Sequence, residues 1–346
     1  MNKILAEDYD NIINSAKSFL PTLTNSKILI TGACGFIGAY LVEMFCYLND
    51  NYGIKARIFA VDSNIASKFD RLSTLGSRSD LVVTECDIAD KDGLWVITDV
   101  DYIINAASIA SPEFYMRYPL QTMRVNSLGT WNVLARAVEV EPRSVLHFSS
   151  SEIYGEPSVI PTPESYWGFV SPNGPRSMYD ESKRFSETLC MIYARDFQVP
   201  VKVIRPFNIF GPGQRIDDGR VIPNLIKAAL CGETFTVYGD GLSTRSYCYI
   251  SDAVIQMLAV LTLGTNGETY NIGDGGSEIS LVDLVKVAND TLPGFPGYSV
   301  NADSQFIQDA PTRRKPDTTK ITELVGSSPR VSLAEGLRRT FETYRT

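Results

Sequence analysis

The chain has 346 residues, of which 44% are hydrophobic and 21% charged, and its formal net charge is −8 at pH 7. That length suffices for one large core or two domains, as expected of a soluble globular protein. The acidic balance argues against a nucleic-acid partner, which needs concentrated Lys and Arg, and the short apolar runs argue against a membrane span.

The first 26 residues predict an amphipathic helix. Their apolar side chains recur at helical spacing from Leu5 to Leu20 and stop near Pro21. We expect this helix to pack on the main body or on a partner subunit, and we assign it no chemistry. The N-terminus lacks the charged and apolar regions of a signal peptide, which predicts a cytoplasmic protein.

A glycine-rich turn follows a short apolar strand at 27–31 and precedes a helical run. It has the spacing GxxGxxG and contains the predicted cofactor residues Gly32, Gly35, Phe36, Ile37 and Gly38. In this order of elements, backbone N–H groups and a helix N-terminus can approach a pyrophosphate. A second strand, 57–61, ends at Asp62, whose carboxylate would bind the adenosine ribose and repel a 2′-phosphate. The pattern predicts NAD rather than NADP; the alternative is a glycine turn that only packs a helix, followed by a capping Asp.

Two further strands, 81–86 and 102–105, are predicted from their apolar runs. The residues that follow them are assigned to the cofactor site: Asp87, Ile88, Ala106, Ala107 and Ser108. Strands that alternate with helices predict an α/β fold with a doubly wound parallel sheet of the Rossmann type. Residues 113–140 predict one long helix. It carries Asn126, a further cofactor residue that we expect to bond to the backbone of the active-site strand.

The fifth predicted strand, 145–149, delivers three polar residues at its carboxyl end, Ser150, Ser151 and Glu152. Doubly wound sheets bind their ligands at that end of the strands. A Pro- and Gly-rich loop follows, and we expect it to cover the site.

Tyr179 and Lys183 form the predicted catalytic pair. A helix expected from residue 179 to about 196 places them one turn apart on the same face. A nearby cation and a helix N-terminus both favour phenolate, which predicts a pKa for Tyr179 below its ordinary value near 10. Tyr179 is therefore a candidate general base, and the Ser150 hydroxyl a candidate to hold the substrate oxygen. The alternative is a helix surface pair without function.

Beyond the strand at 201–205, loops between short elements alternate Gly, aromatic and Arg residues. Aromatic rings suit a nucleotide base, and Arg and Asn suit a diphosphate, so this part predicts a nucleotide-sugar site. The predicted substrate residues are Ser111, Ser151, Asn208, Arg220, Tyr238, Arg245 and Arg314. We divide the chain into the N-terminal helix (1–26), an NAD-binding domain (27–206 with 250–273) and a smaller C-terminal α/β substrate domain (207–346).

The cysteines and the histidine limit which side chains could bind a metal or transfer protons. Six cysteines are scattered without a CxxC pair or metal-ligand spacing, which predicts reduced thiols and no metal site. The single histidine, His147, lies in the apolar run of the fifth strand and is expected to be buried. Proton transfer then falls to Tyr, Glu, Lys or Ser side chains.

These motifs resemble the extended short-chain dehydrogenase/reductase superfamily, specifically its NAD-dependent nucleotide-sugar epimerases and dehydratases. The sequence is most similar to the UDP-glucuronate decarboxylase group, the UDP-xylose synthases, from about residue 27 onward. The pieces SSSEIYGEP, YDESK and RRKPD carry this resemblance. In the decarboxylases an arginine of the last motif, here Arg314, lies by the sugar carboxylate; 4,6-dehydratases usually have Asp where this chain has Ser151. The chain departs from the group with YDESK for YDEGK, Ser150 for Thr, and FNIFGPGQR for FNTFGPRM.

The resemblance implies an enzyme that works through a 4-keto intermediate. Tyr179 would take the O4 proton, with Lys183 keeping it ionised and Ser150 orienting the hydroxyl. Glu152 and Arg314 would position the carboxylate and manage the proton that returns to C5, converting UDP-glucuronate to UDP-xylose with NAD regenerated. The alternatives are a 4,6-dehydratase or 4-epimerase of the same superfamily, or a catalytically silent NAD- or nucleotide-sensing protein. The superfamily also implies a homodimer that pairs two helices of each subunit in a four-helix bundle.

Overall fold

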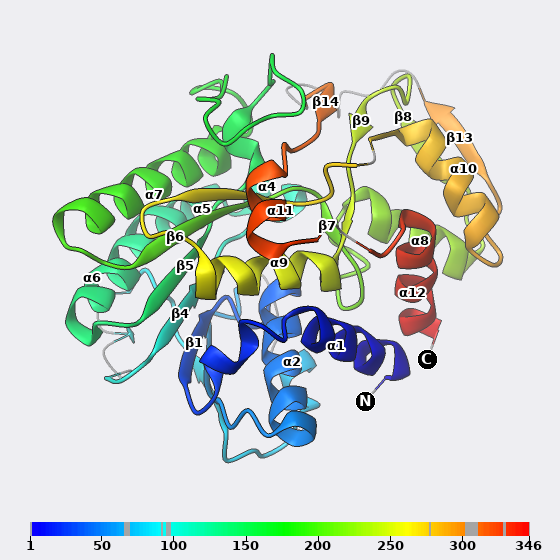
Figure 1. Ribbon diagram of the computed structural model, residues 1–346. Coiled ribbons are helices and arrows are strands. Elements are labelled where there is room, and N and C mark those ends of the chain that lie inside the picture. The colour runs from blue at the N-terminus through cyan, green and yellow to red at the C-terminus, as the bar shows by residue number, and fades with distance from the viewer. Residues whose placement is uncertain are drawn as a thin grey trace.

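The computed structural model describes residues 2–65, 70–90, 93–94, 98–276, 278–301, 311–327 and 330–345. At its centre lies a seven-stranded sheet in the order β11-β6-β5-β4-β1-β2-β3, with every neighbouring pair parallel (Figure 1). The strands are β1 (Lys27–Thr31), β2 (Arg57–Asp62), β3 (Leu81–Glu85), β4 (Tyr102–Asn105), β5 (Ser144–Phe148), β6 (Val201–Pro206) and β11 (Thr269–Ile272). The predicted doubly wound parallel sheet is confirmed.

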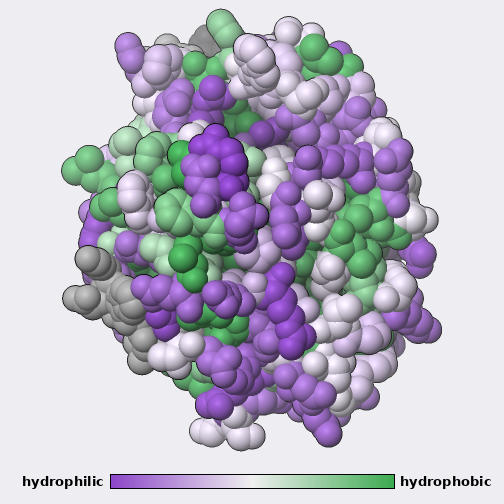
Figure 2. Space-filling model, turned by 60° about the vertical axis from the view of Figure 1, so that its left-hand side comes forward, coloured by the Kyte–Doolittle hydropathy of each residue, from purple (hydrophilic) through white to green (hydrophobic). Residues whose placement is uncertain are grey.

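Helices cover both faces of this sheet (Figure 1). One core contains Ile28 and Ile30 of β1 together with α2 (Phe36–Tyr52) and α9 (Ile250–Leu263). The other core contains Leu29 of β1 together with α6 (Thr130–Val140) and α7 (Ser177–Asp196). Successive residues of a strand point to opposite faces, and helices on both faces explain why these strands are nearly continuous apolar runs. Figure 2 brings the α6 and α7 side forward and shows hydrophobic side chains exposed among hydrophilic ones.

The N-terminal helix α1 (Lys3–Ser15) packs on α2 and α9, in agreement with the prediction that it lies on the main body. Tyr9 and Ile12 join the core on that face. Asp8 is also buried there, and it accepts hydrogen bonds from the Tyr249 hydroxyl (2.7 Å) and from Arg339 Nη1 (2.8 Å). These bonds connect α1 to the C-terminal part of the chain. None of the described helices is long and apolar enough to cross a membrane.

The predicted single helix over 113–140 is wrong. The segment contains α4 (Pro112–Arg117), α5 (Pro119–Arg124), a π-helical turn (Val125–Gly129) and α6. Pro119 lacks the N–H that a continuous helix would use, and it forces Tyr118 out of helical conformation (φ −126°, ψ 57°). The π turn then widens the helix where Asn126 lies.

The C-terminal part is a smaller α/β arrangement, as predicted. Its short sheets pair β7 (Ile209–Phe210) with β10 (Cys248–Tyr249), β8 (Phe235–Tyr238) with β13 (Tyr298–Asn301), and β9 (Thr244–Arg245) with β12 (Ile279–Ser280) and β14 (Arg313–Arg314). The remaining helices are α3 (Asp70–Ser73), α8 (Val221–Cys231), α10 (Leu281–Thr291), α11 (Thr319–Val325), α12 (Leu333–Arg345) and the 3₁₀ turns Leu20–Leu23 and Ser151–Tyr154. All six cysteines are free.

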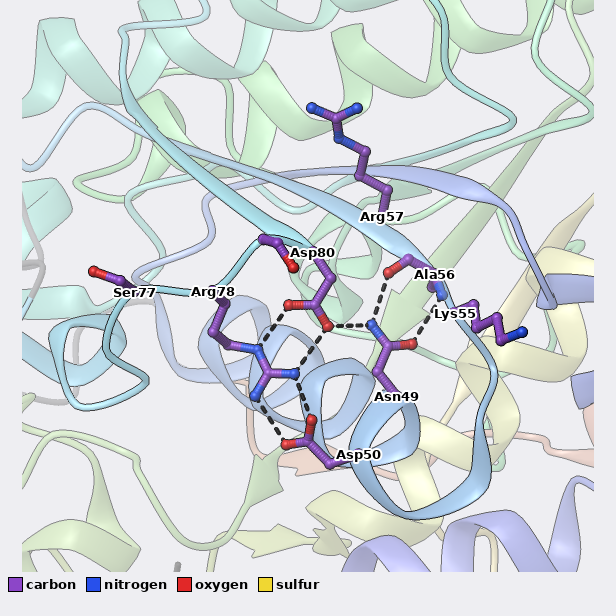
Figure 3. Close-up of a pocket in the computed structure, with 9 residues that line it drawn as sticks. Asn49, Asp50, Lys55, Ala56, Arg57, Ser77, Arg78 and Asp80 are labelled. Atoms are coloured by element: carbon purple, nitrogen blue, oxygen red, sulfur yellow. Dashed lines mark hydrogen bonds and ion pairs between the residues drawn. The ribbon is translucent and has the colours of Figure 1, made fainter.

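A polar cluster connects the end of α2 to the starts of β2 and β3 (Figure 3). Arg78 donates to both oxygens of Asp50 (2.7 and 2.8 Å) and to both oxygens of Asp80 (2.8 Å each). The Asn49 amide donates to the Ala56 carbonyl (2.7 Å) and accepts from its N–H (2.8 Å). These contacts lie at the amino ends of the parallel strands. Doubly wound sheets bind ligands at the carboxyl ends, so this cluster lies on the opposite edge of the sheet.

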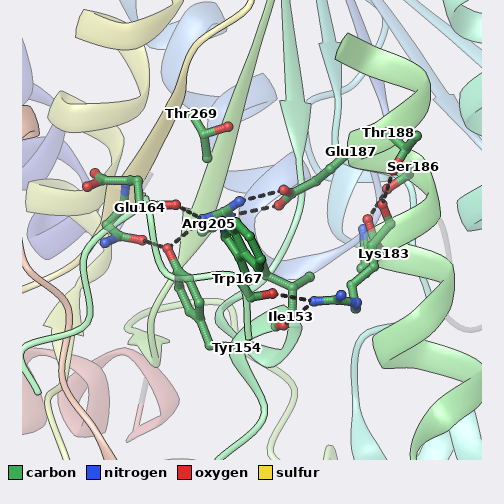
Figure 4. A network of polar contacts seen from close by, with 12 residues as sticks. Ile153, Tyr154, Glu164, Trp167, Lys183, Ser186, Glu187, Thr188, Arg205 and Thr269 are labelled. Carbon is green, nitrogen blue, oxygen red and sulfur yellow. Dashed lines mark hydrogen bonds and ion pairs between the residues drawn. The ribbon is translucent and has the colours of Figure 1, made fainter. Parts of the chain in front are cut away.

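The loop between β5 and α7 is anchored to the sheet (Figure 4). Arg205 of β6 pairs with Glu187 of α7 (2.6 and 2.9 Å) and donates to the Tyr154 hydroxyl (2.7 Å) and the Glu164 carbonyl (2.8 Å). The prediction that this loop covers the site needs correction. Among the described residues between Tyr154 and the start of α7, Pro175 and Arg176 line the cavity of the candidate site. Its middle is tied to β6 and α7 instead, because the buried guanidinium needs these acceptors.

Candidate active site

The carboxyl ends of β1, β4 and β5 open into a cavity of about 1820 Å³. Loops of the C-terminal part complete its wall, including residues from β8, β9 and β14. A single small ligand typically fills a pocket of about 300–1,000 Å³, so the cavity has room for a cofactor and a substrate together. Its place at the ends of parallel strands agrees with the position that doubly wound sheets use.

The glycine turn between β1 and α2 lies in this wall, and two of its glycines have no space for a side chain. Gly32 has φ +67°, and a Cβ there would lie 2.7 Å from the Ala106 carbonyl. A Cβ at Gly38 would lie 2.1 Å from the Gly32 oxygen. Gly35 is the N-cap of α2, and because it carries no capping side chain, the first amides of the helix stay available to a ligand.

A carboxylate lies beside the glycine turn in the same wall. Asp62 ends β2, lines the cavity, and accepts hydrogen bonds from the backbone N–H groups of Cys34 (2.9 Å) and Asn64 (2.9 Å). It is thereby held beside the glycine turn, as the sequence spacing predicts. These residues fit a dinucleotide whose pyrophosphate lies on the helix N-terminus.

Most of the remaining predicted cofactor residues also line the cavity. These are Phe36, Ile37, Asp87, Ile88, Ala106, Ala107 and Ser108. Asn126 is not among the described residues that line it. We predicted a bond from Asn126 to the backbone of the active-site strand; instead its side chain accepts from Ser108 Oγ (2.8 Å) and donates to Ser182 Oγ (2.9 Å). The π turn directs the amide toward α7, so Asn126 connects the loop after β4 to α7.

Tyr179 lies in the first turn of α7 and faces the cavity. Its buried ring stacks on Tyr115, with centroids 5.1 Å apart and planes inclined by 19°. Its phenol is hydrogen-bonded to the Ser150 side chain. Lys183 lies one turn later, and its Nζ is 5.9 Å from the Tyr179 ring centroid while donating to the Phe148 carbonyl (2.7 Å). The predicted pair and its hydroxyl partner therefore share one wall.

The predicted direction of the Tyr179 pKa is wrong. Burial raises this pKa above 10, although the hydrogen bond from Ser150 lowers it. The Lys183 ammonium points to the Phe148 carbonyl instead of the phenol, and burial lowers the pKa of Lys183 to about 7. Removal of water from both groups outweighs the attraction that sequence spacing alone suggested.

Glu152 lies between two arginines. Arg314 donates two hydrogen bonds to it (2.6 Å each), and Arg176 forms a further ion pair. Burial opposes ionisation most strongly, but Arg314 and then Arg176 lower the pKa of Glu152 to about 2. Arg176 was not predicted. Its sequence signal is weak, since it only stands three residues before Tyr179 at the N-cap of α7.

The cavity carries an excess of positive charge near Glu152. Among the described residues, Arg245 donates only to backbone carbonyls, including those of Thr244 (2.8 Å) and Pro311 (2.7 Å). Burial, followed by the repulsion of Arg314, lowers the pKa of Arg245 to about 10. The Nε of Arg176 is buried and finds no acceptor among the described residues. Two guanidinium groups flank Glu152 and a third, that of Arg245, is buried nearby, an arrangement that favours an anionic ligand.

The other predicted substrate residues line the same cavity. Ser111 donates to the Asp218 carbonyl (2.6 Å), Arg220 to the Ala110 carbonyl (2.9 Å), and Asn208 to the Ser246 carbonyl (3.0 Å). Ser151 and Tyr238 complete the predicted set, the first buried and the second half-exposed at the rim. In the described part of the chain, no group of three or more His, Cys, Asp or Glu side chains is arranged to hold a metal ion.

A family comparison agrees with this site. The model of the NAD dependent epimerase/dehydratase family matches residues 28–273. UDP-glucuronic acid decarboxylase 5 of Arabidopsis thaliana is 38% identical over 322 residues, which cover 93% of this chain and 90% of the relative. UDP-glucuronic acid decarboxylase 1 of Xenopus tropicalis is 36% identical over 327 residues, covering 94% and 74%.

Solved structures share the fold over nearly the whole chain. A DesIV double mutant (dTDP-glucose 4,6-dehydratase) from Streptomyces venezuelae with NAD bound is 28% identical, with a TM-score of 0.80 and coverage of 92% of this chain and 96% of that one. A UDP-glucuronic acid 4-epimerase from Bacillus cereus, in complex with UDP-glucuronic acid and NAD, is 27% identical, with a TM-score of 0.79 and coverage of 92% and 99%.

Proposed function

The chain belongs to the NAD-dependent epimerase/dehydratase family, and we propose that it decarboxylates UDP-glucuronate to UDP-xylose. The predictions of this family, of NAD as cofactor and of an enzyme are confirmed by the family match and by the decarboxylase relatives. The observation that carries the proposal is the Glu152 cluster. Arg314 and Arg176 flank this carboxylate beside Tyr179, where a sugar carboxylate would find cationic partners.

Bound NAD would supply the hydride acceptor at C4 of the sugar and return the hydride at the end of the cycle. The turn at Gly32, Gly35 and Gly38 would hold its pyrophosphate, and Asp62 its adenosine ribose. Tyr179 would accept the O4 proton. Ser150 donates to that phenol, which favours the phenolate that burial opposes.

Once C4 is a ketone, the C6 carboxylate is β to it. The C5–C6 bond breaks, carbon dioxide leaves, and the electron pair passes into the ketone as an enolate. Ser150 and Tyr179 would donate to that oxygen, each such donor being worth about 2–4 kcal/mol in other enzymes. With a pKa of about 2, Glu152 is ionised and would hold Arg314 and Arg176 for the sugar carboxylate. The proton that C5 takes up after carbon dioxide leaves would therefore come from solvent, and the 4-ketone would re-form before the hydride returns.

The direct test is product analysis. Purified protein given UDP-glucuronate should release carbon dioxide and a UDP-pentose without net NADH, as measured by mass spectrometry and absorbance. Absence of turnover with any UDP-uronate would overturn the proposed substrate.

The same assay separates the alternatives. The likeness to a UDP-glucuronic acid 4-epimerase makes epimerisation of the same uronate the second candidate, and its product would have unchanged mass. A 4,6-dehydratase would instead lose water from a neutral nucleotide hexose. The presence of Ser151 at the position of the dehydratase acid disfavours that reaction. A silent NAD- or nucleotide-sensing protein would not need the Ser150 hydroxyl, the Tyr179 phenol and the Lys183 amine, which all line this cavity.

A homodimer is part of this proposal. The outer face of α5, the π turn and α6 exposes Leu120 (76% exposed), Leu128 and Trp131 (49%), and α7 adds Phe185. Figure 2 shows this side. Burial of such a face against a second copy would remove apolar surface from water. Trp131→Glu should convert a dimer to a monomer in light scattering, whereas a wild type that is monomeric would overturn the assignment.

The domain boundaries and the compartment also remain proposals. Pairing of β11 with β6 supports assigning 250–273, which contains α9 and β11, to the NAD-binding domain of 27–206. Residues 207–346 otherwise form the substrate domain, and the cytoplasm is the compartment we expect from composition.

A further inference from the structure

Four buried polar side chains form a line across the central sheet. Thr31, Asn105 and His147 are register neighbours on β1, β4 and β5, and Ser186 lies on α7 above them. All four are at most 2% exposed. The core of a parallel sheet normally holds apolar side chains, and a polar one is tolerated there only when its hydrogen bonds are satisfied.

These side chains form a continuous relay. The Thr31 hydroxyl is 2.7 Å from Asn105 Oδ1, and Asn105 Nδ2 is 3.1 Å from His147 Nδ1. His147 Nε2 is 3.0 Å from Ser186 Oγ. Ser186 Oγ in turn is 2.8 Å from the Lys183 carbonyl (Figure 4).

The relay has a defined direction. A carbonyl can only accept, so the Ser186 hydroxyl donates to Lys183, and Ser186 Oγ accepts from His147 Nε2–H. His147 Nδ1 then accepts from the Asn105 amide, whose oxygen accepts from Thr31. In each of these four hydrogen bonds, the donor lies on the β1 side and the acceptor on the α7 side. This assigns the Nε2–H tautomer to His147.

The imidazole is neutral. Burial, followed by the nearby Lys183 ammonium, lowers the pKa of His147 well below 6.5. A charged ring would also disrupt the relay, because both its nitrogens would be donors and Nδ1 already faces the Asn105 amide.

Both ends of the relay reach the active-site cavity. Thr31 precedes Gly32 of the cofactor turn, and its Oγ accepts from the Ala107 N–H (3.3 Å); Gly32 and Ala107 both line the cavity. At the other end, Ser186 fixes the turn of α7 that carries Lys183, whose Nζ donates to the carbonyl of Phe148, the residue after His147.

We propose that His147 is a positioning residue, which couples the cofactor-binding turn of β1 and β4 to the catalytic helix α7 through this relay. It touches neither cofactor nor substrate. It holds the register of α7 on β5, and through that register the places of Lys183 and Tyr179 relative to the cofactor. This role requires that the site binds NAD, and it is independent of which sugar the enzyme converts.

The single histidine makes the relay directly observable. In tag-free protein labelled with ¹⁵N-histidine, NMR should show one imidazole, in the Nε2–H form, that does not titrate between about pH 5 and 8. Addition of NAD⁺ should shift its nitrogen resonances. Thr31→Val, which removes a hydroxyl but keeps the shape, should abolish that response. An Nδ1–H tautomer, a titrating ring or a ring insensitive to NAD⁺ would each overturn the proposal.

A matched control lies on the same strand. Ser144→Ala removes another buried hydroxyl of β5, one that accepts from Lys202 outside the relay (2.8 Å). The His147 response to NAD⁺ should survive this change. If Ser144→Ala abolishes the response as well, the effect is a general loosening of the sheet and the relay is refuted.

Kinetics separate positioning from mere stability. Glutamine can still donate to Ser186, so His147→Gln should retain kcat within about threefold, whereas His147→Phe and Ser186→Ala should lower it about tenfold with KM for the sugar unchanged. The two latter variants give the same readout, so either serves if the other fails to fold. Variants that lower Tm but leave kcat intact would refute the positioning role. Should wild-type protein fail to turn over any nucleotide sugar, the NMR result still decides the relay.

Discussion

The carboxylate of Glu152 provides a quantitative test of the active-site electrostatics. Burial opposes its ionisation most strongly, yet Arg314 and Arg176 lower its pKa to about 2 from an ordinary 4.5. By linkage, a pKa lowered this far stabilises the folded chain by roughly 3 kcal/mol at neutral pH. Because the folded value is the lower one, this stabilisation is present above about pH 4.5 and is lost as the pH falls toward 2.

Glu152→Gln should therefore lower the free energy of unfolding by up to about 3 kcal/mol at pH 7, because Asp180, whose pKa burial and the Glu152 charge raise to about 7, remains as the carboxyl near the two guanidinium groups. For a chain of 346 residues this corresponds to a fall in Tm of roughly 4 °C. Urea unfolding across the acidic range should show the difference between the two proteins shrinking by about half near pH 3.

Glu278→Gln is the matched control. Glu278 also pairs with an arginine, Arg313, but the Arg313 side chain is 54% exposed, so the loss should be less than about 1 kcal/mol. Equal losses for the two variants would refute the reasoning. A Glu152→Gln difference that stays constant from neutral to acidic pH would refute it as well.

Tyr179→Phe should lower kcat by about a hundredfold or more while NAD still binds, because the proton acceptor is lost and the glycine turn is not; near-normal turnover would remove Tyr179 as the base. Gly38→Ala should weaken NAD binding at least about tenfold in calorimetry, because the new Cβ would lie 2.1 Å from the Gly32 oxygen; unchanged affinity would show that this turn is not the cradle. Asp8→Asn should remove the pH dependence of stability that Asp8 contributes below neutral pH, because burial raises the pKa of Asp8 to about 6 and the ionised form is the costly one. Since the folded pKa exceeds the ordinary 3.8, the stability of wild type relative to the variant should rise in thermal melts as the pH falls through about 6, and a difference that does not change with pH would contradict this.

The local features of the fold could be read from the sequence. Apolar runs at strand length, glycines at a strand–helix turn and the four-residue spacing of Tyr179 and Lys183 are set by neighbouring residues, so they follow from backbone geometry and side-chain periodicity. The same reasoning identified Asp62, because the acidic residue that ends the second strand has a defined place beside the first.

The electrostatics and the long-range partners were decided by the tertiary structure alone. Glu152 and Arg314 are far apart in the chain, and Arg176 joins them only because α7 begins beside the end of β5. The break at Pro119 and the turn of Asn126 toward Ser182 likewise depend on what packs against them. The pKa of Tyr179 is raised, and not lowered as the sequence predicted, because burial removes water from the phenol. Burial depends on all the groups packed around a side chain, and spacing along the chain does not reveal them.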